Sequence, residues 1–166
     1  MVKIRIAKQS DIERIVEIYN QAIPTQKSTG FISLLTVEDI QDWFDRHKPE
    51  FYPIFVAEID NKVIGWNSIS AYREKRLAFR FCAETSYYVD KDFHRQGIAS
   101  LMLEHVISVC KSLQVKTLIA YILEQNSPSL SLMHKYGFEQ WGFLPKIADF
   151  DGHEFGHTIY GKRIYS

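Results

Sequence analysis

The sequence predicts an α/β protein of the α+β type, with a central, mostly antiparallel mixed sheet flanked by about four helices. Strand-like segments lie at both ends of the chain, and segments with helical periodicity lie between them. A tight turn at residues 60–62 joins two strand-like segments and favours an antiparallel hairpin. The composition, 46% hydrophobic and 24% charged, is typical of a globular protein and excludes a disordered chain.

The N-terminal part predicts one strand and two helices. Residues 2–6 alternate between polar and apolar side chains and predict the strand. Ser10, with Glu13 three residues later, predicts a capping box for the first helix. Residues 24–35 lose the periodicity and predict a loop, after which Thr36 begins the second helix. The side chains expected to face the core are Ile12, Ile15, Val16, Tyr19 and Ala22, then Val37, Ile40, Trp43 and Phe44.

The middle of the chain predicts the hairpin, another strand and a long helix. The hairpin strands are residues 54–59 and 63–66. Residues 79–89 are rich in aromatic and β-branched side chains and predict the next strand, and the helix follows a break at residues 90–97. The apolar stripe expected on this helix consists of Ile98, Leu101, Met102, Val106, Val109 and Leu113.

The C-terminal part predicts a strand, a helix and a hairpin. Ser127 is the expected cap of the helix, Pro128 its first residue, and Gly137 the residue that ends it. The expected strands are residues 115–123, 139–143 and 157–164, of which the last two form the hairpin.

Length and charge narrow the class of protein. A chain of 166 residues is a one-domain length, and residues 1–166 are expected to form a single domain. Lys and Arg number 20, as do Asp and Glu, which argues against nucleic-acid or membrane-surface partners. No apolar run could span a bilayer, the N-terminus lacks a signal-peptide pattern, and Cys82 and Cys110 give no disulfide framework. A cytoplasmic protein is expected.

The segment between Val89 and Ile98 has the arrangement of an anion-binding turn, in which a strand leads through Gly97 into a helix. The N–H groups of a first helical turn have no partners and carry partial positive charge, and Arg95 adds a full charge. Only one glycine is present, against three in a dinucleotide fingerprint. The segment alone therefore favours an ordinary strand-to-helix turn over an anion-binding one.

Two motifs resemble the GNAT superfamily of N-acetyltransferases. Residues 87–99 resemble its acetyl-CoA loop, and residues 126–138 resemble its second cofactor motif. Further segments narrow the resemblance to the phosphinothricin acetyltransferase-like branch and extend it from Ile4 to about Lys162. These segments are Ile18-Tyr19-Asn20, residues 52–58, Val63-Ile64-Gly65, residues 76–79, Glu84 and residues 150–153.

The resemblance implies the GNAT fold and acetyl-CoA as co-substrate, with no metal. The residues that it implies for binding acetyl-CoA are Tyr87, Tyr88, Val89, Arg95, Gln96, Gly97, Ile98, Ala99, Ser100, Asn126 and Ser129.

The chain departs from the family at two places. In the loop, His94 stands where Arg or Gln is usual, and Arg95 stands where Gly is usual. Met133 stands where the family has a His or Tyr that is proposed to protonate the leaving thiolate. His134 is a reserve candidate, although one residue turns a side chain about 100° around a helix, so an exposed histidine is the alternative. Because a thiol of pKa about 8.5 leaves readily as a thiolate, activity is expected without this acid.

Glu84 matches the family's proposed general base, which would take a proton from the amine directly or through a water. The alternative is a surface carboxylate on the polar face of a strand. Arg76 and Phe79 match positions of the acceptor pocket, where an arginine could hold a carboxylate. The alternative for Arg76 is a solvated member of a charged run. Phe31, in a loop, is expected to form another wall.

The resemblance implies acetyl transfer to the primary amine of a small amino-acid-like substrate, of the phosphinothricin or methionine sulfoximine type, by a homodimer. Two alternatives stay open: acetylation of a protein N-terminus or another small amine, and a catalytically silent acetyl-CoA-binding module. Other catalytic templates are missing, since the histidines lack partners at zinc spacing and no Gly-x-Ser-x-Gly occurs. Trp66 and Tyr72 are expected to pack on the sheet, and both cysteines to be small buried residues.

Overall fold

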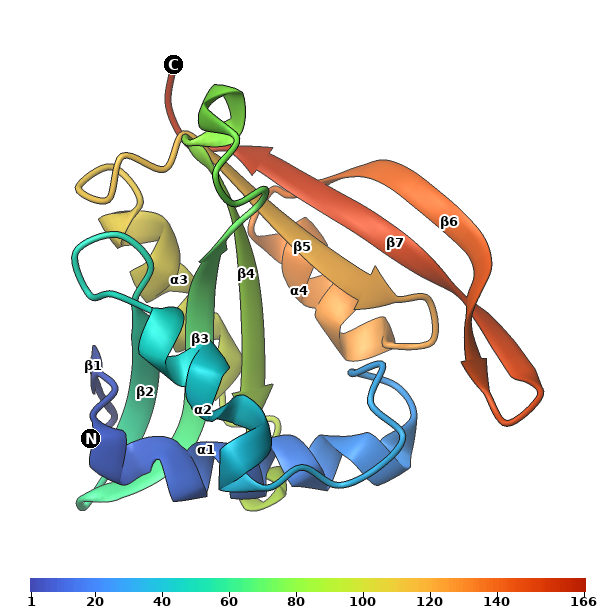
Figure 1. Cartoon of the computed structure of the whole chain (residues 1–166), viewed down its shortest axis with the longest axis horizontal. Helices are drawn as coiled ribbons and strands as arrows, with labels where there is room; N and C mark the ends of the chain where they lie inside the picture. Colours follow the sequence, from blue (N-terminus) through green and yellow to red (C-terminus); the bar gives the residue numbers. More distant parts are fainter.

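The computed structural model describes residues 1–166 and confirms the predicted fold class. The strands are β1 (Lys3–Ile6), β2 (Ile54–Ile59), β3 (Lys62–Ala71), β4 (Cys82–Val89), β5 (Thr117–Leu123), β6 (Glu139–Phe150) and β7 (His153–Arg163), and the helices are α1 (Ile12–Ala22), α2 (Val37–Arg46), α3 (Ile98–Val109) and α4 (Ser127–Lys135). They form one seven-stranded sheet in the order β1-β2-β3-β4-β5-β7-β6, in which only β4 and β5 pair in parallel. Helices α1 and α2 cover one face, and α3 and α4 cover the other (Figure 1).

Apolar side chains fill both faces of the sheet. Trp66, which is 1% exposed, packs under α1 and α2 together with Val56. Leu103 and Cys110 pack between α3 and the other face. The predicted packing of Trp66 and Cys110 is confirmed, whereas Cys82 is only half-buried. Burial from both sides holds the central strands in place.

The start of α1 differs from the prediction, because Ser10 and Glu13 form no capping box. The short 3-10 helix η1 (Gln9–Asp11) precedes α1, and the Asp11 carboxylate accepts the Lys8 N–H at 2.7 Å. Asp11 is buried while Ser10 is exposed. A buried carboxylate that accepts charged donors binds more strongly than an exposed hydroxyl, so Asp11 organises this turn.

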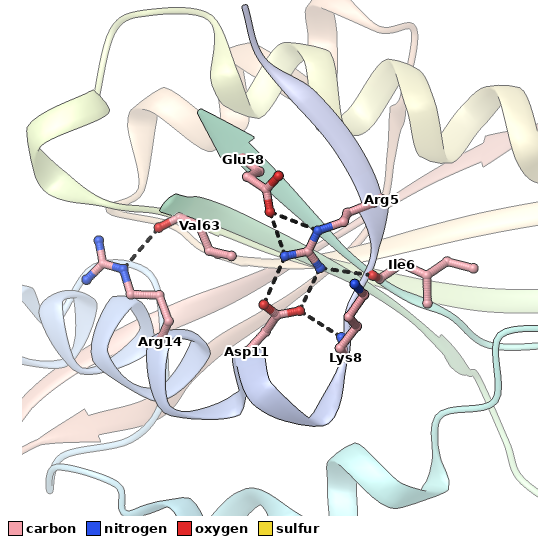
Figure 2. Close-up of polar contacts among 7 residues, drawn as sticks. All are labelled: Arg5, Ile6, Lys8, Asp11, Arg14, Glu58 and Val63. Carbon is pink, nitrogen blue, oxygen red and sulfur yellow. Dashed lines mark hydrogen bonds and ion pairs between the residues drawn. The ribbon is translucent and has the colours of Figure 1, made fainter. Parts of the chain in front are cut away.

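Arg5 ties β1 to β2 and to the start of α1 (Figure 2). Its guanidinium donates to Asp11 at 2.7 and 3.0 Å and to Glu58 at 2.7 and 2.9 Å. Burial opposes ionisation of Asp11, but the hydrogen bonds from Arg5 and from the Lys8 amide outweigh it and lower the pKa of Asp11. The ion pair therefore stabilises the fold at neutral pH, and this contribution disappears as the pH falls through the lowered pKa.

Asp11→Asn is expected to lower the free energy of unfolding by about 2 kcal/mol at pH 7, between the values for exposed and buried ion pairs. For a chain of this length, the melting temperature should fall by about 4–8 °C. Asp42→Asn, which changes an exposed carboxylate on α2, is the control. Thermal unfolding measures the difference in melting temperature between the wild type and Asp11→Asn, which should be smaller at pH 3 than at pH 7. An equal difference at both pH values would contradict the ion-pair role.

The second helix and the first hairpin form where they were predicted. The Thr36 hydroxyl accepts the Asp39 N–H at 3.3 Å, and the Asp39 carboxylate accepts the Thr36 N–H at 2.7 Å. This reciprocal capping box fixes the start of α2. The hairpin joins β2 to β3 through the predicted turn, and β3 continues to Ala71, five residues beyond the predicted strand end at Trp66.

Two helical stripes differ from the prediction. In α1, Ile18 is buried, while Tyr19 and Ala22 are partly exposed. In α3, Leu103 is fully buried and Leu101 is 42% exposed. In each helix the buried face is rotated slightly from the predicted apolar stripe. The side chains of the sheet determine which helical residues pack against it.

The C-terminal elements also shift. Asn126 rather than Ser127 caps α4, because its Oδ1 accepts the Ser129 N–H at 3.3 Å. Gly137 ends the helix with φ of +71°, as predicted. The terminal hairpin is longer than predicted, with 12 residues in β6 and 11 in β7. Phe79 belongs to the short 3-10 helix η3 (Leu77–Phe79), so β4 begins only at Cys82.

The two parallel strands separate soon after they meet. Strands β4 and β5 pair at Cys82–Thr117, Ala83–Leu118 and Glu84–Ile119, and at no later position. Beyond Glu84 they diverge, as Figure 1 shows. We call the region between residues 85–89 of β4 and residues 120–123 of β5 the fork.

Candidate active site

Backbone groups of β4 face the fork without a partner in β5. Asp90 donates to the Ile64 carbonyl at 2.8 Å, and Tyr72 donates to the Cys82 carbonyl at 3.3 Å. The even-numbered residues of β4 therefore form their backbone hydrogen bonds with β3. Because the direction of these groups alternates along a strand, the N–H and C=O groups of the odd-numbered residues point toward β5. The N–H groups of Tyr87 and Val89 thus line the fork, where they could donate to an extended polar ligand.

The start of α3 fits a phosphate group. Gly97 is the residue before α3, with φ of +79°, and a Cβ there would meet nothing within 4 Å. The backbone around Gly97 is therefore open to a ligand, and the first N–H groups of α3 have no helical partners. Arg95, in the left-handed region with φ of +61°, and Gln96 are both exposed beside it.

Other predicted acetyl-CoA residues lie at the ends of α3 and α4 near this loop. The Ile98 side chain is buried in the core, so only its backbone is available, while Ala99 and Ser100 are partly exposed. Lys135 of α4 approaches the Ser100 hydroxyl at 3.4 Å, which brings a second cation to the start of α3. Asn126 and Ser129 meet in the cap of α4, at the side of the fork opposite to α3.

Tyr88 lies elsewhere than the predicted cofactor residues around it. Its backbone pairs with Trp66 of β3, and its ring packs on Tyr19 at 4.4 Å, on the α1 face of the sheet. Its hydroxyl donates to the Ser28 carbonyl at 2.9 Å. Tyr88 therefore belongs to the wall on the α1 side, which Phe31 extends by packing edge-on against Tyr19 at 5.6 Å.

Glu84 stands where the fork begins. It pairs with Ser70 on one side and Ile119 on the other, so its side chain projects from the same face as that of Tyr88. Burial raises the pKa of Glu84, and the Ser86 hydroxyl and the Arg73 charge oppose this only in part. A carboxylate with a raised pKa, beside unpaired backbone donors, is suited to take a proton from an amine.

The structure places Arg73 and Tyr121 near Glu84, and His157 next to Tyr121, although the sequence analysis assigned none of these residues to the site. Arg73 acts electrostatically on both Glu84 and Tyr121 and forms no ion pair. Burial, with the neighbouring Tyr72 and Glu84, raises the pKa of Tyr121. The Tyr121 ring lies 5.4 Å from that of His157, and burial lowers the pKa of His157. Strand register alone brings Tyr121 and His157 here, and no local sequence signal marks them.

The predicted acceptor residues of η3 are exposed. Arg76 precedes η3 and contacts no carboxylate. Phe79 is 43% exposed and packs edge-on against Tyr72 at 5.6 Å. Tyr72 also carries the Arg73 guanidinium 4.7 Å above its ring, so the partly exposed Tyr72 is a platform for Arg73 as well as a packing residue.

A surface hollow of about 200 Å³ lies on the other side of Ser70. His47 lines it and is held by two contacts, from Nδ1 to the Trp43 carbonyl at 2.6 Å and from Nε2 to the Ser70 hydroxyl at 3.0 Å. Burial lowers the pKa of His47, which favours the neutral ring. The residues that line the hollow include none from β4 or β5, so it does not share a wall with the fork.

Met133 and His134, the two candidates for the acid, have different surroundings. Met133 is 0% exposed and packs in the core beside Leu103. His134 is exposed, as the alternative interpretation expected, and its Nε2 lies 3.0 Å from the Tyr160 hydroxyl. His134 thus has a structural partner on β7. No group of three or more His, Cys, Asp or Glu side chains could hold a metal ion, and no helix has the length and apolar composition to cross a membrane.

The forked sheet, the open α3 terminus and the half-buried carboxylate of Glu84 fit an acyltransferase that binds a phosphorylated carrier. The Acetyltransferase (GNAT) family model matches residues 12–138. The chain belongs to the GNAT family and is an acetyl-CoA-dependent N-acetyltransferase.

Individual relatives cover nearly the whole chain. YwnH of Bacillus subtilis, named provisionally as a phosphinothricin acetyltransferase, is 35% identical over 97% of this chain and 98% of its own. An L-methionine sulfoximine/L-methionine sulfone acetyltransferase of Pseudomonas aeruginosa is 29% identical over 94% of this chain and 88% of its own. A solved GNAT superfamily phosphinothricin acetyltransferase from Sinorhizobium meliloti, in complex with acetyl-CoA, has a TM-score of 0.90 at 25% identity, covering 98% of this chain and 88% of its own.

Proposed function

We propose that the chain transfers the acetyl group of acetyl-CoA to the α-amino group of a small amino acid. The observation that carries this proposal is the pairing of charges at the fork. Glu84 is a half-buried anion, and Arg73 is a nearby cation without an ion-pair partner. An amino acid carries an ammonium and a carboxylate on one carbon, so it complements both groups at once.

The chemistry follows from these positions. The ammonium of the acceptor loses its proton to Glu84, which frees the lone pair for attack on the acetyl carbonyl carbon. The N–H groups of Tyr87 and Val89 are positioned to stabilise the oxyanion, a contribution of about 3 kcal/mol per donor. The C–S bond then breaks, and its electron pair leaves on the sulfur of CoA.

The names of the relatives support an amino-acid acceptor. Phosphinothricin and methionine sulfoximine, named for two of them, are both small amino acids. The aromatic wall formed by Tyr19, Tyr88 and Phe31 offers an apolar surface for a short side chain. We further propose that Arg95, Gln96 and the α3 terminus hold the pyrophosphate of CoA.

A thiol-release assay with acetyl-CoA and a panel of amines tests the proposal. The panel contains methionine sulfoximine, phosphinothricin, proteinogenic amino acids, their methyl esters, a peptide N-terminus and a simple alkylamine. We expect turnover with free amino acids and much lower turnover with their methyl esters, because the esters lack the carboxylate. Preference for the peptide would favour N-terminal acetylation, and no turnover despite acetyl-CoA binding would favour a silent binding module.

We also propose that two copies associate through β6. This strand ends the sheet and exposes Trp141, Phe143, Leu144 and Ile147, which are 49%, 44%, 40% and 56% exposed. An apolar edge strand of this length attracts another chain unless it is covered, and a second copy can cover it symmetrically.

We place the protein in the cytoplasm, where acetyl-CoA is made and the unpaired Cys82 and Cys110 stay reduced. We treat residues 1–166 as a single domain.

Ile147→Asp is expected to convert a dimer into a monomer, since a charge buried in an apolar interface has no partner there. Phe51→Asp changes a residue that is 65% exposed outside β6 and serves as the control. Light scattering after gel filtration measures the mass. A monomeric wild-type chain, or a dimer that survives Ile147→Asp but not Phe51→Asp, would contradict the role of β6.

A further inference from the structure

The hydroxyl of Tyr87 is one of four buried side-chain polar atoms without a hydrogen-bond partner, and the amide nitrogen of Asn67, opposite Tyr87 on β3, is another. The Tyr87 hydroxyl is buried and makes no well-formed hydrogen bond. Tyr87 is an odd-numbered residue of β4, so its backbone faces the fork, while its ring packs with core residues of α3 and α4. A buried hydroxyl without a hydrogen-bond partner destabilises the fold, so such a group calls for a ligand or a role.

The hydroxyl approaches the start of α4. Ser129 is the polar side chain that acts on it. Ser129 and Met133 are four residues apart on α4 and therefore share one face of the helix. Met133 is a thioether with no proton to donate, and it is sealed in the core. Tyr87 thus brings a hydroxyl from β4 to the part of α4 that carries Ser129 and Met133.

Glu84 and Tyr87 project from opposite faces of β4. Successive side chains of a strand alternate between its two faces, and these two residues are three positions apart. Glu84 therefore projects from the α1–α2 face and Tyr87 from the α3–α4 face. An amine that loses its proton to Glu84 approaches the acetyl carbon from the first face. The thiolate that leaves departs on the other side of that carbon, toward the face that carries Tyr87.

We propose that the Tyr87 hydroxyl donates a hydrogen bond to the sulfur of CoA as the thiolate leaves. Strand β4 then supplies both the base, Glu84, and the group that stabilises the leaving thiolate. This proposal rests on acetyl transfer and not on the identity of the acceptor. The amine nitrogen forms its bond to the acetyl carbon, the C–S bond breaks, and the electron pair stays on sulfur.

The proton remains on Tyr87 throughout. Burial raises the pKa of Tyr87 to about 12, and the Ser129 side chain opposes this only in part. A thiol of pKa about 8.5 is the stronger acid, so the phenol stabilises the thiolate without protonating it. Solvent supplies the proton to CoA after release.

Titration of CoA bound to the protein tests this contact without any acceptor. The absorbance of the thiolate is followed against pH for free CoA, for CoA on the wild-type chain and for CoA on Tyr87→Phe. A hydrogen bond to the anion should increase the ratio of thiolate to thiol about 10-fold on the wild-type chain. Tyr87→Phe should restore the value of free CoA. Tyr165→Phe, which removes a hydroxyl beyond the end of β7, should change nothing.

A second measurement separates the sulfur contact from packing. At pH 9, Tyr87→Phe should weaken binding of CoA about 10-fold relative to desulfo-CoA, which lacks the thiol. Turnover should fall by a similar factor with little change in the KM of acetyl-CoA. A wild-type chain that leaves the CoA thiol titrating as it does in water would overturn the proposal without any variant. Equal losses for CoA and desulfo-CoA in Tyr87→Phe would overturn it as well.

Discussion

Glu84→Gln should lower turnover at least 10-fold at neutral pH, toward the 10²–10⁴ range of general-base catalysis. Glutamine keeps the size and hydrogen-bonding shape of glutamate but cannot accept the proton that the ammonium must lose. The half-buried position of Glu84 beside β3 and β5 is compatible with the uncharged amide, so the fold should be unaffected. Binding of acetyl-CoA should also be unchanged, because the donors for it lie farther along the fork.

The pH profile makes this assignment specific. Because burial raises the pKa of Glu84, kcat/KM should fall on acidification at a pH above 4.5, the ordinary value for a glutamate. That acidic limb should disappear in Glu84→Gln. Glu154→Gln, at an exposed carboxylate of β7, should keep both the rate and the limb. Full turnover in Glu84→Gln, or an unchanged limb at low turnover, would remove Glu84 from the role of base.

Arg73→Ala should raise the KM of an amino-acid acceptor about 30-fold and leave the KM of acetyl-CoA unchanged. A charged hydrogen-bonded pair contributes about 2 kcal/mol, which corresponds to this factor. Arg73 is chosen because its charge reaches Glu84 and Tyr121 from a platform on Tyr72. Arg73→Lys should recover only part of the loss, since an ammonium cannot form the bidentate pair.

Arg76→Ala is the matched comparison, because the sequence predicts Arg76 for this contact and the structure leaves it exposed before η3. We expect it to raise the KM of the acceptor less than Arg73→Ala does. An acceptor methyl ester should abolish the difference between Arg73→Ala and the wild type. A larger increase in the acceptor KM for Arg76→Ala would assign the carboxylate contact to Arg76. If a variant raised the KM values of the acceptor and of acetyl-CoA equally, the carboxylate contact would be ruled out for that residue.

Local rules predicted the parts of the fold that depend on neighbouring residues. The hairpin turn, the cap of α2 by Thr36 and the end of α4 at Gly137 all depend on backbone geometry within a few residues. Side-chain stripes were less reliable, as Leu101 and Leu103 show, because the opposing sheet decides which row of a helix is buried. The predicted cap at Ser10 was wrong because Arg5, which also binds Glu58 far along the chain, makes Asp11 the stronger organiser.

By itself, the sequence determined the class of fold, and its resemblance to the GNAT superfamily predicted that residues 87–99 form the acetyl-CoA loop. The same resemblance predicted Glu84 as the general base. Only the tertiary structure decided what surrounds Glu84. Arg73, Tyr121 and His157 come from separate elements, and Tyr87 turns to the opposite face. Strand register and the divergence of β4 from β5 set these neighbours, and both result from packing between segments far apart in the chain.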